Sequence, residues 1–223
     1  SSSQVQVITV QDTIAPVLDA APDDVTVECD AVPTAATLSA TDNCDANPNV
    51  SFSETRTDGS CDATYTLTRT WTATDECGNS SSQVQVITVQ DTTAPSLIGG
   101  ADGNAECTGS NPAENADYIA WLNNYAGIST SDRCGDATMS YTEGTWTSTG
   151  CTDTITVTFT ATDECGLTSS QNQTFVISDN TPPALAGGDN GNAESTGPDP
   201  SLNAEYNSWL NNYAGITTTD ICG

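Results

Sequence analysis

The chain has 223 residues and a formal net charge of −27, because three Lys and Arg residues stand against 30 Asp and Glu residues. Nucleic acids and anionic lipid surfaces are recognised by basic patches, so this composition argues against both as partners. It also lacks an apolar run long enough for membrane insertion. The charge favours divalent cations or a saline medium, although a single carboxylate is ordinarily part of a solvated acidic face.

The chain is an array of one repeated unit. The segment SSSQVQVITVQDT occurs at residues 1–13 and again at 80–92, and the turn ATDEC occurs at 73–77 and 161–165. We expect an interior piece of a longer secreted protein. The repetition divides the sequence into residues 1–11, the last strand of a preceding repeat; residues 12–90, the first repeat; residues 91–178, the second repeat; and residues 179–223, a truncated third repeat of the second type.

Short alternating segments separated by polar turns predict an all-β fold of tandem immunoglobulin-like β-sandwiches. Strands are expected in the first repeat at residues 25–29, 35–40, 50–57, 64–74 and 83–89. The segment 64–74 is the clearest, with threonine at every second position and mainly apolar residues between them. Arg69 falls on the apolar face, so we expect it at the sheet edge or paired with a carboxylate.

The second repeat carries an insertion at residues 111–127 that is predicted to be a short helix. Asn111 is the expected N-cap and Gly127 the expected end. Aromatic residues recur at helical spacing, and the third repeat has the same pattern. They either pack on their own sandwich or form an interface with another repeat or chain. The candidate interface residues are Tyr118, Trp121, Tyr125, Tyr206, Trp209 and Tyr213.

The nine cysteines occupy matching places in the repeats, which indicates disulfides and an extracellular, oxidising location. The absence of His and of a C-x-x-C pair argues against a zinc site. Four cysteines per repeat allow three connectivities. We expect pairing within each repeat, because two cysteines of each repeat follow similar turns at one pole and two lie at the other. The predicted bonds are Cys29–Cys61, Cys44–Cys77, Cys107–Cys151 and Cys134–Cys165, with the partner of Cys222 beyond residue 223.

The sequence resembles the hyalin-repeat (HYR) family. The resemblance rests on DTTAP at residues 91–95, ATDNC at 40–44 and RTWTATDECGNSSSQ at 69–83, and it covers the first repeat and most of the second. It is nearest to the HYR-like repeats of giant surface proteins of Bacteroidota. The inserted helix departs from the family pattern.

The resemblance implies immunoglobulin-like sandwiches in tandem and a role in cell adhesion. For Bacteroidota it also implies type IX secretion, cell-surface filaments that include gliding adhesins, contact with other cells, and O-glycosylation at Asp-Thr-apolar triplets. The triplets assigned to this pattern begin at Asp12, Asp91 and Asp153, and the one at Asp91 has threonine in the third place.

Calcium is the candidate cofactor, because it requires several oxygen ligands that converge in one loop or domain boundary. Two equivalent sets of acidic residues lie in the linkers and in the turns at the ends of strands. The alternative is that these side chains cap turns by accepting backbone N–H groups. The sets are Asp12, Asp42, Asp75 and Glu76 in the first repeat, and Asp91, Asp132, Asp163 and Glu164 in the second.

We therefore predict a segment of a giant secreted protein that is a structural stalk or adhesive cell-surface filament. Its expected partners are neighbouring repeats, identical chains in a filament, and a cell-surface or glycan target. Carbohydrate-binding or spacer modules of a secreted enzyme are the alternative, with aromatic residues of the helices as the sugar platform. No catalytic role is expected, because His and Lys are absent and no carboxylate pair lies in an evident cleft. A pilus subunit that donates residues 1–10 as a strand fits poorly, because the third repeat lacks several strands.

Overall fold

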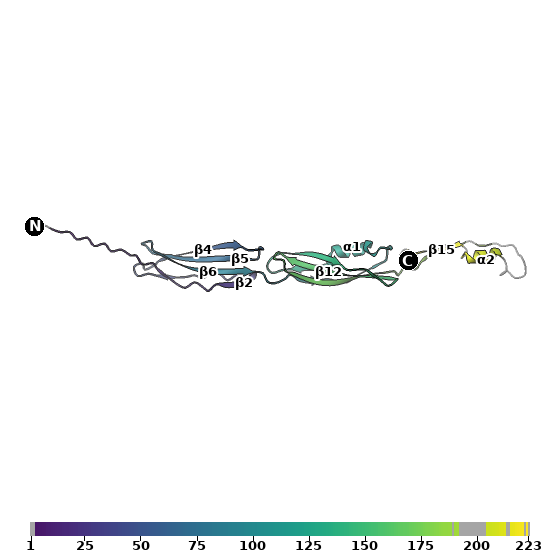
Figure 1. Ribbon diagram of the computed structural model, residues 1–223, viewed down its shortest axis with the longest axis horizontal. Coiled ribbons are helices and arrows are strands. Elements are labelled where there is room, and N and C mark those ends of the chain that lie inside the picture. Colours follow the sequence, from purple (N-terminus) through teal and green to yellow (C-terminus); the bar gives the residue numbers. More distant parts are fainter. Residues whose placement is uncertain (1–2, 189, 192–203, 213–214, 221, 223) are drawn as a thin grey trace. The chain divides into compact units, whose positions relative to one another are not determined.

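The computed structural model describes residues 3–188, 190–191, 204–212, 215–220 and 222 (Figure 1). The fold is all-β, and the described residues add only short helical segments. The chain forms two compact units. Unit 1 comprises Ser1–Ser96, Thr130–Thr138 and Ala161–Ser169, and unit 2 comprises Leu97–Ser129, Met139–Thr160 and Ser170–Gly223. Unit 1 thus combines the first repeat with two turns of the second.

The first repeat is an immunoglobulin-like sandwich of a four-stranded sheet, in the order β2-β6-β5-β4, and a two-stranded sheet of β1 and β3. Strands β2 and β6 are parallel, whereas β5 is antiparallel to β4 and β6. The elements are β1 (Val17–Leu18), β2 (Val25–Glu28), the 3₁₀ turn η1 (Cys29–Ala31), β3 (Ala40–Thr41), β4 (Asn49–Asp58), β5 (Tyr65–Thr74) and β6 (Ser80–Gln90). The strand expected at residues 35–40 is wrong, because only its last residue enters β3.

The alternation of β5 decides which of its side chains enter the core. Trp71 is 1% exposed, and its indole N–H donates to the carbonyl of Ala36 at 3.0 Å. Arg69 is 4% exposed and lies directly opposite Glu54 on β4. The guanidinium Nε donates to the Glu54 carboxylate at 2.7 Å, which supplies the partner that a buried cation requires. The expected pairing of Arg69 with a carboxylate is therefore confirmed.

The second repeat builds its main sheet in the order β10-β12-β13-β8, with β11 beside β12, and pairs β7 with β9. Strands β14 and β15 belong to the third repeat and pair antiparallel. The strands are β7 (Ser96–Gly99), β8 (Gly103–Glu106), β9 (Ile128–Ser131), β10 (Ala137–Glu143), β11 (Thr147–Ser148), β12 (Thr152–Asp163), β13 (Thr168–Ser178), β14 (Ala184–Gly187) and β15 (Ile216–Thr219).

The insertion is a helix interrupted at two points. It consists of η2 (Pro112–Glu114), α1 (Ala116–Asn123) and η3 (Tyr125–Gly127), and the third repeat has the matching helix α2 (Ala204–Asn211). Asn111 caps only η2, whereas Asn115 caps α1 by accepting the N–H groups of Asp117 and Tyr118. The expected single helix from Asn111 is therefore wrong, because the extended backbone of Asn115 separates η2 from α1. Gly127 ends the insertion with φ of +75°, as predicted. No helix in the described part of the chain has the length and apolar character to cross a membrane.

Helix α1 contributes two buried side chains, Tyr118 and Leu122, to the core of unit 2. Tyr118 is 1% exposed, and its ring lies 5.0 Å from that of Trp146 and 5.2 Å from that of Phe175. Its hydroxyl donates to the Glu143 carboxylate at 2.7 Å. Burial, followed by that carboxylate, raises the pKa of Tyr118 above its ordinary value. The tyrosine therefore stays protonated and keeps this hydrogen bond.

Substitutions at Tyr118 separate packing from hydrogen bonding. Tyr118→Phe is expected to lower the free energy of unfolding by about 1 kcal/mol, because one hydrogen bond is lost. Tyr118→Ala is expected to lower it by about 4 kcal/mol, because a buried ring is removed. Chemical denaturation measures both. The control is Ile119→Ala on the same helix, where the side chain is 43% exposed. A Tyr118→Ala cost as small as that of the control would contradict the core assignment.

Candidate functional site

Each linker between repeats begins with an aspartate that folds its own backbone. Asp12, Asp91 and Asp179 each accept the N–H of the residue two positions later through Oδ1, at 3.1, 3.0 and 3.1 Å. A short polar side chain that accepts a nearby backbone N–H stabilises a turn. The three linkers therefore share one local structure.

A second aspartate stands two residues before a cysteine in each repeat. Asp42, Asp132 and Asp220 accept the N–H of that cysteine through Oδ1 at 2.8, 2.7 and 3.1 Å. The third position is the aspartate of the ATDEC turn. Asp75 and Asp163 accept the N–H four residues later at 2.7 and 2.8 Å. These contacts confirm that the aspartates cap turns.

Turn capping leaves carboxylate oxygens without a hydrogen-bond partner. The Oδ2 atoms of Asp42, Asp132 and Asp163 are buried and accept no hydrogen bond among the described residues. A buried polar atom is normally paired, since an unpaired one costs about 1–3 kcal/mol. Capping and metal binding are thus compatible, because one oxygen caps the turn and the other remains available as a ligand.

The first group of carboxylates, which we call the N-terminal cluster, comprises Asp12, Asp42 and Asp75. One oxygen of each lies within 4.8 Å of the others, and Asp75 is only 6% exposed. Cys44 lies beside this cluster. Loss of hydration, followed by the charges of Asp12 and Asp42, raises the pKa of the Cys44 thiol, although the residue as a whole is exposed.

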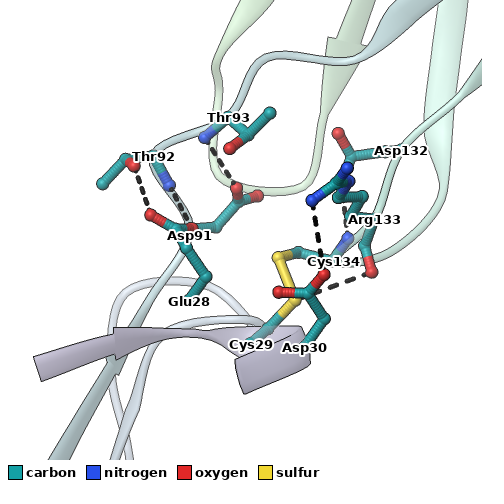
Figure 2. Close-up of polar contacts among 9 residues, drawn as sticks. All are labelled: Glu28, Cys29, Asp30, Asp91, Thr92, Thr93, Asp132, Arg133 and Cys134. Atoms are coloured by element: carbon teal, nitrogen blue, oxygen red, sulfur yellow. Dashed lines mark hydrogen bonds and ion pairs between the residues drawn. A yellow bond between two sulfur atoms is a disulfide. The ribbon is translucent and has the colours of Figure 1, made fainter. Parts of the chain in front are cut away.

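The second group, which we call the linker cluster, centres on Asp91 and belongs to unit 1. Glu28, Asp91 and Cys134 have potential ligand atoms within 4.8 Å of one another. Burial raises the pKa of Asp91, and repulsion by Asp132, Asp163 and Glu28 raises it further. Figure 2 shows the carboxyl groups of Glu28 and Asp91 on neighbouring stretches of chain. We define the linker cluster as Glu28 and Asp91 together with Asp132 and Asp163, which are included because their charges act on Asp91; the sulfur of Cys134 is excluded because it is in a disulfide.

The sequence-based sets omitted Glu28. Its carboxylate accepts the Thr92 N–H at 3.1 Å and the Thr92 hydroxyl, as drawn in Figure 2. These hydrogen bonds lower the pKa of Glu28. Glu106 has the same role at the next linker, where it accepts the Asn180 N–H at 2.8 Å and its pKa is lowered. The available signal was the glutamate that directly precedes a cysteine in both VTVEC and GNAEC.

The remaining sequence-predicted ligands lie elsewhere. Glu76 and Glu164 are exposed, and neither belongs to a metal-compatible group in the described part of the chain. A further group appears in unit 2, where Asp179 and Asp220 lie beside Cys222. These two aspartates match Asp12 and Asp42 in position, so the third linker repeats the arrangement of the first.

The cysteines are paired between repeats, which overturns the predicted pairing within each repeat. The bonds Cys29–Cys61, Cys44–Cys77, Cys107–Cys151 and Cys134–Cys165 are not formed. The three disulfides are Cys29–Cys134, Cys61–Cys165 and Cys107–Cys222, and Cys44, Cys77 and Cys151 are free and exposed. Cys222 therefore has its partner within the chain.

The physical reason is the short linker at residues 91–95. Cys29 follows the end of β2 and Cys61 precedes β5, as expected. The partners, Cys134 and Cys165, lie in turns of the second repeat that belong to unit 1. Beside the first bond, the Arg133 guanidinium lies 3.6 Å from the Asp30 carboxylate, as seen in Figure 2. The prediction compared only cysteines at the same pole of one repeat, so it omitted the nearer thiols of the second repeat.

The linker cluster has the donor chemistry of a hard divalent cation. Calcium takes six to eight oxygen ligands, commonly carboxylates, backbone carbonyls and water. The unpartnered buried oxygens of Asp132 and Asp163 fit that requirement, as does the repulsion that raises the pKa of Asp91. Asp42 and its neighbours offer the same chemistry in the N-terminal cluster.

The aromatic residues of the first helix pack on the core of unit 2, which is the alternative to the predicted interface. Trp121 donates its indole N–H to the Ala101 carbonyl at 2.9 Å, and its ring lies 5.4 Å from that of Phe159. Tyr125 packs against the same core. In the third repeat, Tyr206 and Trp209 are 40% and 36% exposed, and Tyr213 lies outside the described residues.

Comparison with known proteins gives a family match and several distant structural likenesses. No curated protein matches the chain. The similar solved structures include Drosophila N-cadherin EC1-4, with 12% identity over 75% of this chain and 50% of that chain and a TM-score of 0.34. Protocadherin gammaB7 EC3-6 shows 14% identity over 78% of this chain and 50% of that one, with a TM-score of 0.30. This chain thus spans half the length of both structures. Residues 17–89, which form most of the first repeat, match the model of the family described as HYR-like domain with 4 cysteines.

Proposed function

We propose that this chain is a segment of an extracellular tandem-repeat protein that acts as a structural stalk or adhesive cell-surface filament. The observation that carries the proposal is the pair of disulfides Cys29–Cys134 and Cys61–Cys165. They bond the first repeat covalently to two turns of the second. A chain whose consecutive repeats are cross-linked in this way transmits tension through sulfur bonds as well as through the linker.

Disulfides also support an extracellular location, because such bonds persist in oxidising compartments. Each closes a loop of about 105 residues, which stabilises the folded chain by about 4–5 kcal/mol in the chain-entropy model. The match of residues 17–89 to an HYR-like domain supports an adhesion-type module without catalytic activity. Export by type IX secretion and a bacterial cell-surface context are part of the proposal.

Calcium is the proposed cofactor of the linkers. Glu28, Asp91, Asp132 and Asp163 would hold it in the linker cluster, where it would neutralise mutually repelling carboxylates and restrict the turn that begins at Asp91. The proposed partners are neighbouring repeats, identical chains in a filament, and a target on another cell. A sugar platform on α1 receives no support, since Tyr118 is buried.

Immunogold electron microscopy on the producing cells tests the proposal. Antibodies against unit 1 are expected to label filaments outside the cell at regular positions along their length. Cells that lack the gene are the control and are expected to lose both the label and their attachment to surfaces or other cells. Label confined to the cell interior, or filaments that persist unlabelled, would contradict the stalk function.

A further inference from the structure

Cys44 occupies the same local structure as a cysteine that is already bonded. Its N–H donates to Asp42 Oδ1 at 2.8 Å, and the N–H of Cys134 donates to Asp132 Oδ1 at 2.7 Å. Both cysteines thus stand two residues after a capping aspartate. Cys134 is bonded to Cys29, whereas Cys44 is free and exposed.

Cys77 has the same relation to Cys165. Both lie in an ATDECG turn, and the glycine that follows each has φ of +90° or +87°. In both turns this glycine N–H donates to the carbonyl of the turn aspartate, at 3.2 and 3.3 Å. Cys165 is bonded to Cys61, whereas Cys77 is free and exposed. Cys44 and Cys77 of the first repeat are therefore free cysteines in turns with the same local structure as the turns of the second repeat that carry bonded cysteines.

The segment at residues 3–11 is a strand sequence without a sheet. It is identical to residues 82–90 of β6. In β6, Ile87 and Val89 are fully buried. Their counterparts Ile8 and Val10 are 79% and 92% exposed, and residues 3–11 form no strand. Burying these side chains requires the flanking strands of another sandwich, equivalent to β2 and β5.

The N-terminal cluster also lacks a component that the linker cluster has. Asp12, Asp42 and Asp75 correspond to Asp91, Asp132 and Asp163, but among the described residues no glutamate joins the first three as Glu28 joins Asp91. The Oδ2 atom of Asp42 is buried without a hydrogen-bond partner among the described residues. A glutamate directly before a bonded cysteine would complete this cluster.

We propose that Cys44 and Cys77 bond to two cysteines of another β-sandwich repeat, which takes residues 1–11 as its last strand. Its cysteine equivalent to Cys29 bonds to Cys44, and its cysteine equivalent to Cys61 bonds to Cys77. The same partner buries Ile8 and Val10 and supplies the missing glutamate. One occupant thus accounts for the free cysteines, the exposed strand and the incomplete cluster. The inference rests on the proposed covalent array and extends it beyond the first repeat.

Each bond forms by exchange with a small-molecule disulfide such as oxidised glutathione. A thiolate of one repeat attacks this disulfide, forms a mixed disulfide and releases one small thiol. The thiolate of the partner cysteine then attacks the mixed disulfide, which forms the bond between repeats and releases the second small thiol. The two cysteines lose two protons and two electrons, and the small-molecule disulfide is reduced to two thiols.

The repeated sequence allows a direct test. Residues 1–13 are identical to residues 80–92, so a copy of residues 12–79 placed before Ser1 rebuilds a whole first repeat that ends in residues 1–11. In the added copy, serine replaces the equivalents of Cys44 and Cys77, so that these two residues are unique. The chain is oxidised with glutathione, alkylated and digested with an Asp-specific protease. Mass spectrometry identifies the linked peptides, and amide hydrogen exchange follows residues 3–11.

The extended chain is expected to link DNC, which contains Cys44, to DVTVEC, and the Cys77 peptide to DGSC. Alkylation is expected to fall from the three free cysteines of the original chain to Cys151 alone. Exchange at residues 3–11 is expected to slow to the rate of β6. A Cys44–Cys77 bond, three or more alkylated cysteines, or unchanged exchange would each overturn the inference. None of these results bears on immunogold labelling, so failure here is distinguishable from failure of the proposed function.

Discussion

Pulled between its two ends, the oxidised chain is expected to reach a fully unfolded length of only roughly 200 Å, against roughly 750 Å after reduction. The covalent path explains the difference. It runs from Ser1 to Cys29, crosses to Cys134, returns to Cys107 and crosses to Cys222. This path contains about 60 residues at about 3.4 Å each. Single-molecule force spectroscopy with and without a reductant measures both lengths.

A double variant makes the expected length specific to this pairing. In Cys29→Ser with Cys134→Ser, the shortest path runs from Ser1 to Cys107 and crosses to Cys222 instead. This path contains about 110 residues, so the unfolded length is expected to be roughly 370 Å. The matched control is Cys44→Ser with Cys77→Ser, which leaves all three bonds intact and is expected to keep the length of roughly 200 Å. Pairing within repeats would instead give roughly 500 Å for the oxidised chain.

Calcium is expected to raise the melting temperature of the oxidised chain, and a chelator to reverse the effect. A ligand at a hundred times its Kd stabilises the folded state by about 2.7 kcal/mol. For a chain of this size, that shifts the melting temperature by roughly 5–10 °C. Differential scanning calorimetry in calcium and in chelator measures the shift. Equal melting temperatures in both would contradict a calcium site.

Asp91→Asn is expected to raise the melting temperature in chelator and to reduce the further increase that calcium causes. The amide oxygen can still accept the Thr93 N–H, which donates to Asp91 Oδ1 at 3.0 Å, so the turn is preserved. In chelator, we expect a higher melting temperature, because repulsion by Asp132, Asp163 and Glu28 is relieved. In calcium, we expect a smaller shift, because one ligand charge is lost. The control is Glu164→Gln, an exposed carboxylate outside the cluster. A decrease in both conditions would show only structural damage.

The alternation of apolar residues was sufficient to predict the main strands. Strand β5 lies within one residue of its expected start, because its threonine face and apolar face differ at every position. Residues 35–40 were harder, since three of the six are alanine, which is depleted in strands, and only the last residue finds a pairing partner. In the insertion, the period predicted the buried face of α1. It could not place the interruption at Asn115, whose side chain forms contacts with Glu106 that no local pattern encodes.

The acidic residues show how far position alone can predict a site. Asp12, Asp42 and Asp75 come together because each follows a linker or a strand end at one pole of the sandwich. Glu28 was missed because its carboxylate belongs to one repeat and the linker that it contacts leads into the next. The cysteine pairing failed for the same reason. The distance between two cysteines depends on where the linker places the next repeat along the chain. Strand alternation carries no information about that placement.

The central claim is that consecutive repeats are joined by disulfides, and peptide mapping tests it most directly. Cleavage before aspartate places each of the nine cysteines on a separate peptide. Under non-reducing conditions, we predict that DVTVEC is linked to DRCG, the Cys61 peptide to the Cys165 peptide, and the Cys107 peptide to DICG. Links between the Cys29 and Cys61 peptides, and between those of Cys134 and Cys165, would contradict the account.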